Sequence, residues 1–308
     1  MSTQSNAVPQ SSLDTQGIAP APTSATRVFY WSLRRELWEN RYICIAPLAA
    51  AGVILLVFLL SMTRVHHRML WVAALDPTKR HEALANPYDI AAGILMAVQI
   101  LIGVYYSIET LYADRRDRSI LFWKSLPVSD ITTVLSKASV PIVIIPLVTA
   151  VLSIAMMWLM LLINSAAFAV SGQNVAMLWK ELALAQVSGL VVYHLLTVHA
   201  LWHAPFYGWF LLVSSWAKRA PLLWAFLPPL ALYGLERILF NTSHFQDLLI
   251  YRLSGGPEGT TNMDFPTDPG MQITQWRFLT SAGLWDGLLF TGICLALAIR
   301  MRRYRGPS

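Results

Sequence analysis

The stretch ICIAPLAAAGVILLVFLLSM, residues 43–62, decides the fold class of this chain. It contains no charged side chain. A helix rises about 1.5 Å per residue, so about 20 apolar residues cross the 30 Å hydrocarbon layer of a membrane. Backbone groups inside lipid must form hydrogen bonds within their own segment, and this requirement favours a helix. The stretch therefore predicts a membrane-spanning helix.

Five further apolar runs follow, and together they predict an all-α, polytopic membrane protein. The composition agrees, because 56% of the 308 residues are hydrophobic and only 13% are charged, whereas soluble domains carry about a quarter charged residues. The period-two alternation of a membrane barrel is absent from the sequence. We expect one membrane domain over residues 26–305, with spans at about 43–62, 90–111, 138–164, 182–213, 221–240 and 281–299.

The fourth run is unusual in its length. No Asp, Glu, Lys or Arg occurs from Leu182 to Ala217, which is too long for one simple crossing and too short for two crossings with a loop. Pro205 lies inside the run and removes a helical hydrogen bond. We favour one kinked helix that extends past the bilayer over a helix followed by a short interfacial segment.

Two different segments precede the first span. Residues 1–25 are rich in Ser, Thr, Gln, Ala and Pro and lack the pattern of a signal peptide, which predicts a disordered cytoplasmic tail. In residues 26–40, three apolar side chains share one helical face, and Arg27, Arg34, Arg35, Glu36 and Glu39 supply the polar side. This pattern favours an amphipathic helix in the headgroup plane. A plain extension of the first span is the alternative.

The basic residues predict the topology. Six crossings put both termini on one side of the membrane, and most of the 23 lysines and arginines fall on that side. Lys and Arg accumulate in cytoplasmic segments, so we expect both termini in the cytoplasm. The first outer loop departs from the rule, because it carries Arg64, Arg68, Lys79 and Arg80. The net charge of +6 thus reflects membrane topology, and no nucleic-acid partner is expected.

The most informative segment is DRRDRSILFWKSLPVSD, residues 114–130, between the second and third spans. Alternating charges are followed by a cluster of four large apolar residues, 120–123. Pro127 ends any helix there. Ser129 is placed to cap the next helix. Four large apolar residues exposed to water would promote aggregation. The cluster is therefore expected to insert into a hydrophobic cleft on a partner protein. The alternative is that Phe122 and Trp123 anchor the loop in the headgroups.

This segment resembles the coupling-helix region of bacterial ABC transporter permeases of the type-2 exporter branch. The order of elements is similar too: an amphipathic helix before span one, six spans, and the motif between spans two and three. The segments HAPFYGWF, residues 203–210, and APLLWAFLPP, residues 220–229, add to the resemblance. It covers about residues 26–305, and Asp286 departs from the family pattern.

The resemblance implies a permease subunit in the bacterial inner membrane. It would pair with a second permease subunit, identical or different, and with two copies of an ATPase subunit that bind ATP and Mg. The docking residues implied by the motif are Asp114, Arg115, Arg116, Asp117, Arg118, Ser119, Ile120, Leu121, Phe122, Trp123, Lys124, Ser125, Leu126 and Pro127. The sequence contains no Gly-Lys pair, which a phosphate-binding loop requires. We therefore expect no enzymatic activity and no cofactor in this chain alone.

Ionisable side chains inside lipid are functional candidates, because burying them is costly. Those in the predicted spans are Glu109, His194, His199, His203, Glu236, Arg237 and Asp286. Glu109 belongs either to the coupling region or to the interface, which its side chain can reach. We expect Arg237 and Asp286 to approach each other, because an unpaired buried charge is unfavourable.

The histidines of the fourth run raise the question of a metal. His199 and His203 are four residues apart and share a helical face. Two histidines make an incomplete metal site, so we expect polar packing or pathway lining and no bound metal.

Two other functional classes compete with an exporter permease. A membrane scaffold or assembly factor would recruit a soluble partner through the same 114–130 loop. An intramembrane enzyme would need paired catalytic groups at membrane depth, and no motif in the sequence suggests such a pair.

Overall fold

The computed structural model describes residues 24–64, 75–117, 128–172, 174–255 and 278–304, and these residues form helices joined by short turns, without a strand. The predicted tail, residues 1–25, lies almost wholly outside them, as does the central part of the 114–130 loop. The helical segments are α1 (Ala25–Glu39), α2 (Tyr42–Ser61), η1 (Met62–Arg64), α4 (Pro77–Arg116), α6 (Asp130–Ser139), η2 (Val140–Ile144), α7 (Ile145–Val170), α8 (Val175–Leu182), α9 (Leu184–His194), η3 (Leu195–Trp202), α10 (Ala204–Trp216), α11 (Pro221–Leu239), α12 (His244–Leu253) and α14 (Ala282–Tyr304).

Six helical stretches of the described residues are long and apolar enough to cross a membrane. They cover Tyr42–Ser61, Lys79–Arg116, Asp130–Val170, Val175–Trp202, Pro221–Leu239 and Ala282–Tyr304. The prediction of an all-α, multi-pass membrane protein is confirmed for this part of the chain. The first and fifth spans match their predicted bounds to within a residue at each end.

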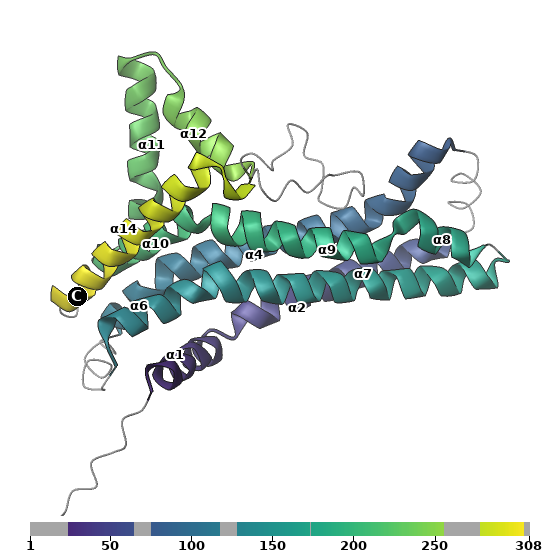
Figure 1. The fold of residues 1–308 in the computed structure, drawn as a ribbon, viewed down its shortest axis with the longest axis horizontal. Helices are drawn as coiled ribbons and strands as arrows, with labels where there is room; N and C mark the ends of the chain where they lie inside the picture. The colour runs from purple at the N-terminus through teal and green to yellow at the C-terminus, as the bar shows by residue number, and fades with distance from the viewer. Residues whose placement is uncertain (1–23, 65–74, 118–127, 173, 256–277, 305–308) are drawn as a thin grey trace, which may run out of the picture.

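Three helical columns are much longer than one crossing. α4 has 40 residues, which corresponds to about 60 Å, or twice the hydrocarbon thickness. α6, η2 and α7 form a second continuous column, and α8, α9, η3 and α10 form the third. Figure 1 shows the columns side by side along the long axis of the molecule. The sequence prediction located the apolar part of each column and missed its extensions, because those contain more polar residues.

The fourth span is interrupted twice. A break at His203 directly precedes the first turn of α10, which contains Pro205, and the fourth candidate span ends just before it, at Trp202. A second, unexpected break lies at Ala183, whose backbone is left-handed with φ of 43°. Between the two breaks, η3 is a π-helix, and the His203 backbone N–H donates to the Val198 carbonyl at 3.0 Å, a five-residue step.

Close packing fixes α10 between α4 and α14. A Cβ atom on Gly103 of α4 would lie 2.9 Å from the Tyr207 ring of α10. A Cβ atom on Gly208 would lie 3.2 Å from the Thr291 Cα of α14. These two glycines therefore let α10 approach a neighbour on each side.

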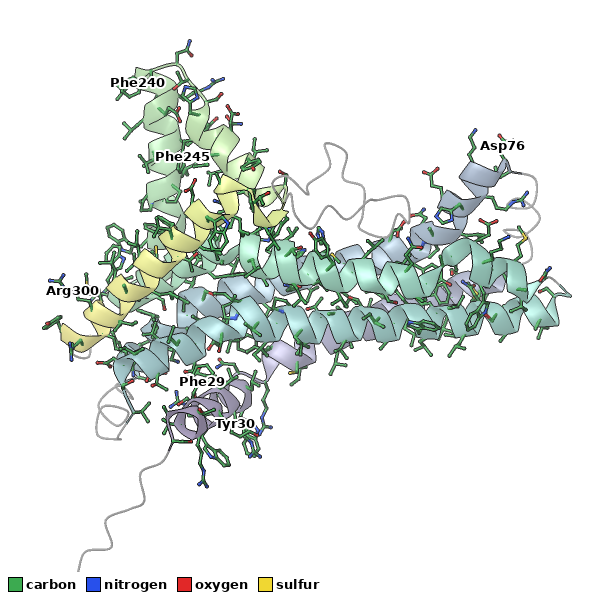
Figure 2. The ribbon with its side chains drawn as sticks, viewed as in Figure 1. Phe29, Tyr30, Asp76, Phe240, Phe245 and Arg300 are labelled. Atoms are coloured by element: carbon green, nitrogen blue, oxygen red, sulfur yellow. The ribbon has the colours of Figure 1, made fainter. Side chains whose placement is uncertain are left out.

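The N-terminal helix is separate from the first span, because the chain turns at Asn40 and Arg41. Leu33 and Leu37 pack against the core at the foot of the bundle, and Figure 2 shows Phe29 and Tyr30 on the same helix. The assignment of Glu36 to the outer polar side was wrong. Its side chain is fully buried, because a lysine of α6 pairs with it.

Candidate functional site

Five charged side chains meet at the end of the bundle where the 114–130 loop begins and ends. We call them the stem cluster: Glu36 of α1, Asp114 of α4, Asp130 and Lys137 of α6, and Arg302 of α14. Except for Asp130, they are nearly or fully buried. Buried charges are tolerated when they are paired and hydrogen-bonded, and each member of this cluster has an ionic partner.

Lys137 joins α6 to α1 and α4. Its Nζ lies 3.0 Å from Glu36 Oε1 and 3.4 Å from Asp114 Oδ1. It also donates to the Thr110 hydroxyl at 2.9 Å. The Tyr106 hydroxyl donates to Glu36 Oε2 at 2.9 Å. All three ammonium hydrogens of Lys137 thus have acceptors, and α1 is attached to the bundle through its one buried carboxylate.

Arg302 connects the two ends of the loop. Its Nη1 lies 3.0 Å from Asp114 Oδ2, at the first residue of the loop, and its Nε lies 3.1 Å from Asp130 Oδ1, at the last. The Arg302 side chain is 4% exposed. One guanidinium on α14 therefore holds α4 and α6 together at the base of the loop, and a movement of either helix end changes a contact with α14.

The pKa of Glu36 is set by two opposing effects. Burial raises it, whereas the positive charges of Lys137 and Arg35 lower it by more, and the result is a pKa below the ordinary value. The Arg35 guanidinium donates to Glu36 Oε1 at 2.6 Å. Glu36 is therefore ionised at neutral pH, and the cluster functions as a set of charge pairs.

The first four residues of the predicted docking segment, at the end of α4, divide into two groups. Asp114 and Arg115 are buried, and Arg115 donates to the backbone carbonyls of Ser214 and Ala217 at 2.7 and 2.8 Å. It thereby caps the last turn of α10, where a positive charge is favourable. Arg116 and Asp117 are exposed. The two buried residues hold the stem, and the two exposed ones pair with each other at 3.0 Å on the surface.

Glu109 contacts one of the exposed residues. Its Oε1 accepts from Arg116 Nη1 at 2.7 Å, which joins a residue of the span to the predicted docking segment. The remaining members of that segment, Arg118, Ser119, Ile120, Leu121, Phe122, Trp123, Lys124, Ser125, Leu126 and Pro127, lie outside the described residues. As predicted, Ser129 caps the following helix, because its hydroxyl accepts from the Thr132 backbone N–H at 3.1 Å.

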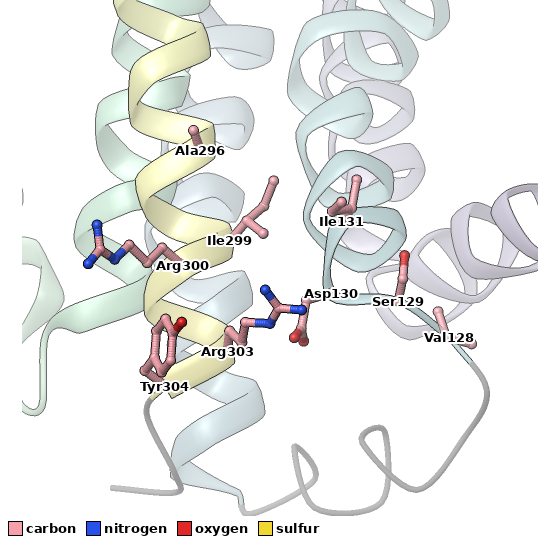
Figure 3. Close-up of a pocket in the computed structure, with 9 residues that line it drawn as sticks. All are labelled: Val128, Ser129, Asp130, Ile131, Ala296, Ile299, Arg300, Arg303 and Tyr304. Carbon is pink, nitrogen blue, oxygen red and sulfur yellow. The ribbon is translucent and has the colours of Figure 1, made fainter.

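A cavity of about 660 Å³ adjoins the end of the loop, between the start of α6 and the last turns of α14. Figure 3 shows Arg303 directed across it toward Asp130, and Arg300 pointing away from it. Tyr304 lies at its lower edge in that view. The hollow is therefore bordered by basic residues beside the segment that the sequence predicts to bind a partner.

The three histidines of the fourth span lie in a row, with neighbouring rings steeply inclined to each other. The rings of His194 and His199 lie 5.3 Å apart, and those of His199 and His203 lie 5.4 Å apart. The π-helix adds one residue per turn and so brings His194 onto the same face, which the four-residue spacing alone did not indicate. In the described part of the chain, no group of three or more His, Cys, Asp or Glu side chains is arranged to hold a metal ion.

The predicted approach of Arg237 to Asp286 does not occur among the described ion pairs. Glu236 turns toward α12 and accepts from the backbone N–H groups of His244 and Phe245 at 2.8 and 2.9 Å. Arg237, the next residue, projects about 100° further round the helix and is exposed. Asp286 instead lines a cavity together with Arg252.

Sequence reasoning missed the pairing within the stem cluster. In the sequence, Lys137 and Arg302 are merely two of the 23 basic residues that predict the topology, and Asp130 is the last residue of the 114–130 motif. A signal was present, because Lys137 and Arg302 each lie at the edge of a long apolar run. A charge at such a position either reaches the interface or needs a buried partner.

No known family model matches the chain, and no curated protein or solved structure matches it either.

Proposed function

We propose that this chain is the membrane-spanning permease subunit of an ATP-driven exporter of the ABC class. A separate ATPase subunit, present in two copies, binds ATP and Mg, and a second permease subunit completes the pathway. The loop at residues 114–130 docks on the ATPase, and the movement of the ATPase pair is passed to the spans. The protein is located in the bacterial inner membrane, with both termini in the cytoplasm.

The observation that carries the proposal is the attachment of the loop. Its sequence resembles a coupling helix, and Arg302 binds both of its ends at 3.0 and 3.1 Å. Lys137 extends the connection to α1. A loop that transmits movement needs rigid elements at its base, because a flexible base would absorb the displacement. The buried stem cluster supplies such a base.

The distribution of charge supports the orientation. Four basic segments lie together at the stem end, because α1 packs on α6, Arg115 contacts the end of α10, and Arg302 of α14 contacts Asp130. Lys218 and Arg219 directly follow the end of α10. Basic residues favour the cytoplasmic side, which is also the side where an ATP-hydrolysing partner would find its nucleotide.

The test is co-purification from native membranes. The full-length chain with an affinity tag is expected to retain a protein that contains a phosphate-binding loop, with ATPase activity in the complex. The double variant Phe122→Ala/Trp123→Ala is expected to lose at least tenfold of that partner, since aromatic residues at interface centres often contribute 2 kcal/mol or more. Membrane insertion should be retained.

The matched control changes two aromatic residues elsewhere. Trp31 and Trp38 of α1 are 50% and 64% exposed, and Trp31→Ala/Trp38→Ala is expected to leave the partner bound. Equal recovery of the ATPase by the Phe122/Trp123 variant would refute the docking role. A tightly bound partner that hydrolyses no nucleotide would favour the scaffold alternative instead.

A further inference from the structure

A second cavity, of about 490 Å³, lies between α10, α11, α12 and α14, away from the stem cluster. Figure 1 shows α11 and α12 as a hairpin that leaves the long bundle, with α14 crossing near its base. The rings of Phe206, Trp209, Phe245 and Phe290 line the cavity. Small-molecule sites in proteins typically measure about 300–1,000 Å³, so this cavity has the size of a ligand site.

One wall of this apolar cavity is charged. Arg252 of α12 and Asp286 of α14 both line it, yet no ion pair joins them in the described part of the chain. Burial lowers the pKa of the Arg252 guanidinium, and the Asp286 carboxylate acts in the opposite direction. The two opposite charges thus influence each other without being joined.

The Arg252 side chain is fixed by contacts on one side, and one of its guanidinium nitrogens has no hydrogen-bond acceptor among the described residues. Its Nη2 donates to the Gly283 carbonyl, and its guanidinium carbon lies 4.4 Å from the centre of the Trp202 ring. A Cβ atom on Gly287 would lie 2.6 Å from Arg252 Nη1, so the glycine lets the guanidinium lie directly against α14. Nη1 itself is buried and has no hydrogen-bond partner within the described part of the chain. A buried donor without a partner is unfavourable, and an acceptor supplied by a ligand would remove that penalty.

We propose that this cavity binds a zwitterionic phospholipid, with the phosphate on Arg252, the ammonium group beside Asp286 and the apolar part against the aromatic rings. The charges are complementary, and the fixed guanidinium is preorganised for a phosphate. The acyl chains extend beyond the cavity along α11, whose apolar side chains are mostly exposed, among them Leu230 and Leu232. This binding site does not depend on the proposed transport function.

The experiment uses the purified full-length chain in detergent and native mass spectrometry. The protein is incubated with equal amounts of phosphatidylethanolamine and phosphatidylglycerol that have the same acyl chains. We expect the ethanolamine lipid to be retained preferentially. Arg252→Met is expected to lower its occupancy at least tenfold, a loss that corresponds to about 1.4 kcal/mol and that a hydrogen bond to a charged group usually exceeds.

Asp286→Asn removes the negative charge and preserves side-chain volume at an exposed position. It is expected to lower the preference for ethanolamine over glycerol lipid about tenfold while leaving the thermal stability unchanged. Arg237→Met, at the exposed end of α11, is the matched control and should change neither occupancy nor preference. Equal retention of the two lipids by the unmodified protein, or an unchanged preference in Asp286→Asn, would overturn the proposal.

Discussion

Replacing Arg302 with Gln tests whether one side chain holds the base of the 114–130 loop. The contact with Asp114, at 3.0 Å between nearly buried groups, should contribute about 2 kcal/mol, within the usual range for a hydrogen bond between charged groups. The contact with Asp130 should contribute about 1 kcal/mol, because that carboxylate is 27% exposed and therefore screened by solvent. Together they predict a loss of about 3 kcal/mol, which is about a hundredfold in a local equilibrium.

The assay is hydrogen–deuterium exchange of the protein in lipid nanodiscs, followed by mass spectrometry of α6. Exchange of protected amides reports the local opening equilibrium. Arg302→Gln should therefore accelerate exchange in residues 130–139 by about a hundredfold. Arg300→Gln is the control, because Arg300 lies on the same helix and points away from the cavity between α6 and α14 (Figure 3).

Exchange in Arg302→Gln that stays within threefold of the Arg300→Gln value would refute the reasoning. A double-mutant cycle with Asp130→Asn isolates the pair, and its coupling energy should be near 1 kcal/mol. If the proposed function is also correct, Arg302→Gln retains the ATPase partner and weakens the dependence of ATPase activity on the permease. Loss of the partner itself would assign Arg302 to docking instead.

Two further perturbations test the packing around the cluster and the helices that support it. Glu36 has a lowered pKa, so its ionised form stabilises the fold above its ordinary value of 4.5, and this stabilisation disappears as the pH falls below that value through the folded pKa. The difference in melting temperature between the unmodified protein and Glu36→Gln should therefore be constant from about pH 8 to 5 and shrink below pH 4.5; a constant difference at all pH values would contradict this. Gly208→Ala should destabilise the protein by about 1–2 kcal/mol, because the added methyl meets the Thr291 backbone at 3.2 Å. Gly292→Ala is the control, because no neighbouring atom of the described residues lies within 4 Å of the added methyl. It should be neutral or stabilise the protein by up to about 1 kcal/mol. Equal melting temperatures for these two variants would show that α10 and α14 are not closely packed.

The membrane spans were predictable from the sequence because they depend on local composition. Residues 43–62 and 221–240 each contain enough apolar side chains to make lipid the favourable surroundings, whatever the rest of the chain does. Their observed bounds, Tyr42–Ser61 and Pro221–Leu239, agree closely. The break before Pro205 was predictable for a similar reason, since a missing N–H acts within one turn.

The candidate sites depended on helix rotation and register, which composition does not specify. Glu36 and Lys137 are 101 residues apart, and Asp114 and Arg302 are 188 apart. Successive residues of a helix project about 100° apart, so a charge faces its partner only when both helices have the right rotation. The same limit explains the wrong prediction for Arg237 and Asp286.

The sequence by itself determined that this chain crosses a membrane repeatedly and carries an aromatic, basic loop between its second and third spans. Hydrophobicity and chain length decide those properties residue by residue. Only the tertiary structure decided that one arginine of the last helix holds both ends of that loop, and that a cavity beside α12 keeps a cation and an anion apart. Such arrangements require side chains from distant segments to meet, and their meeting is fixed by how the helices pack.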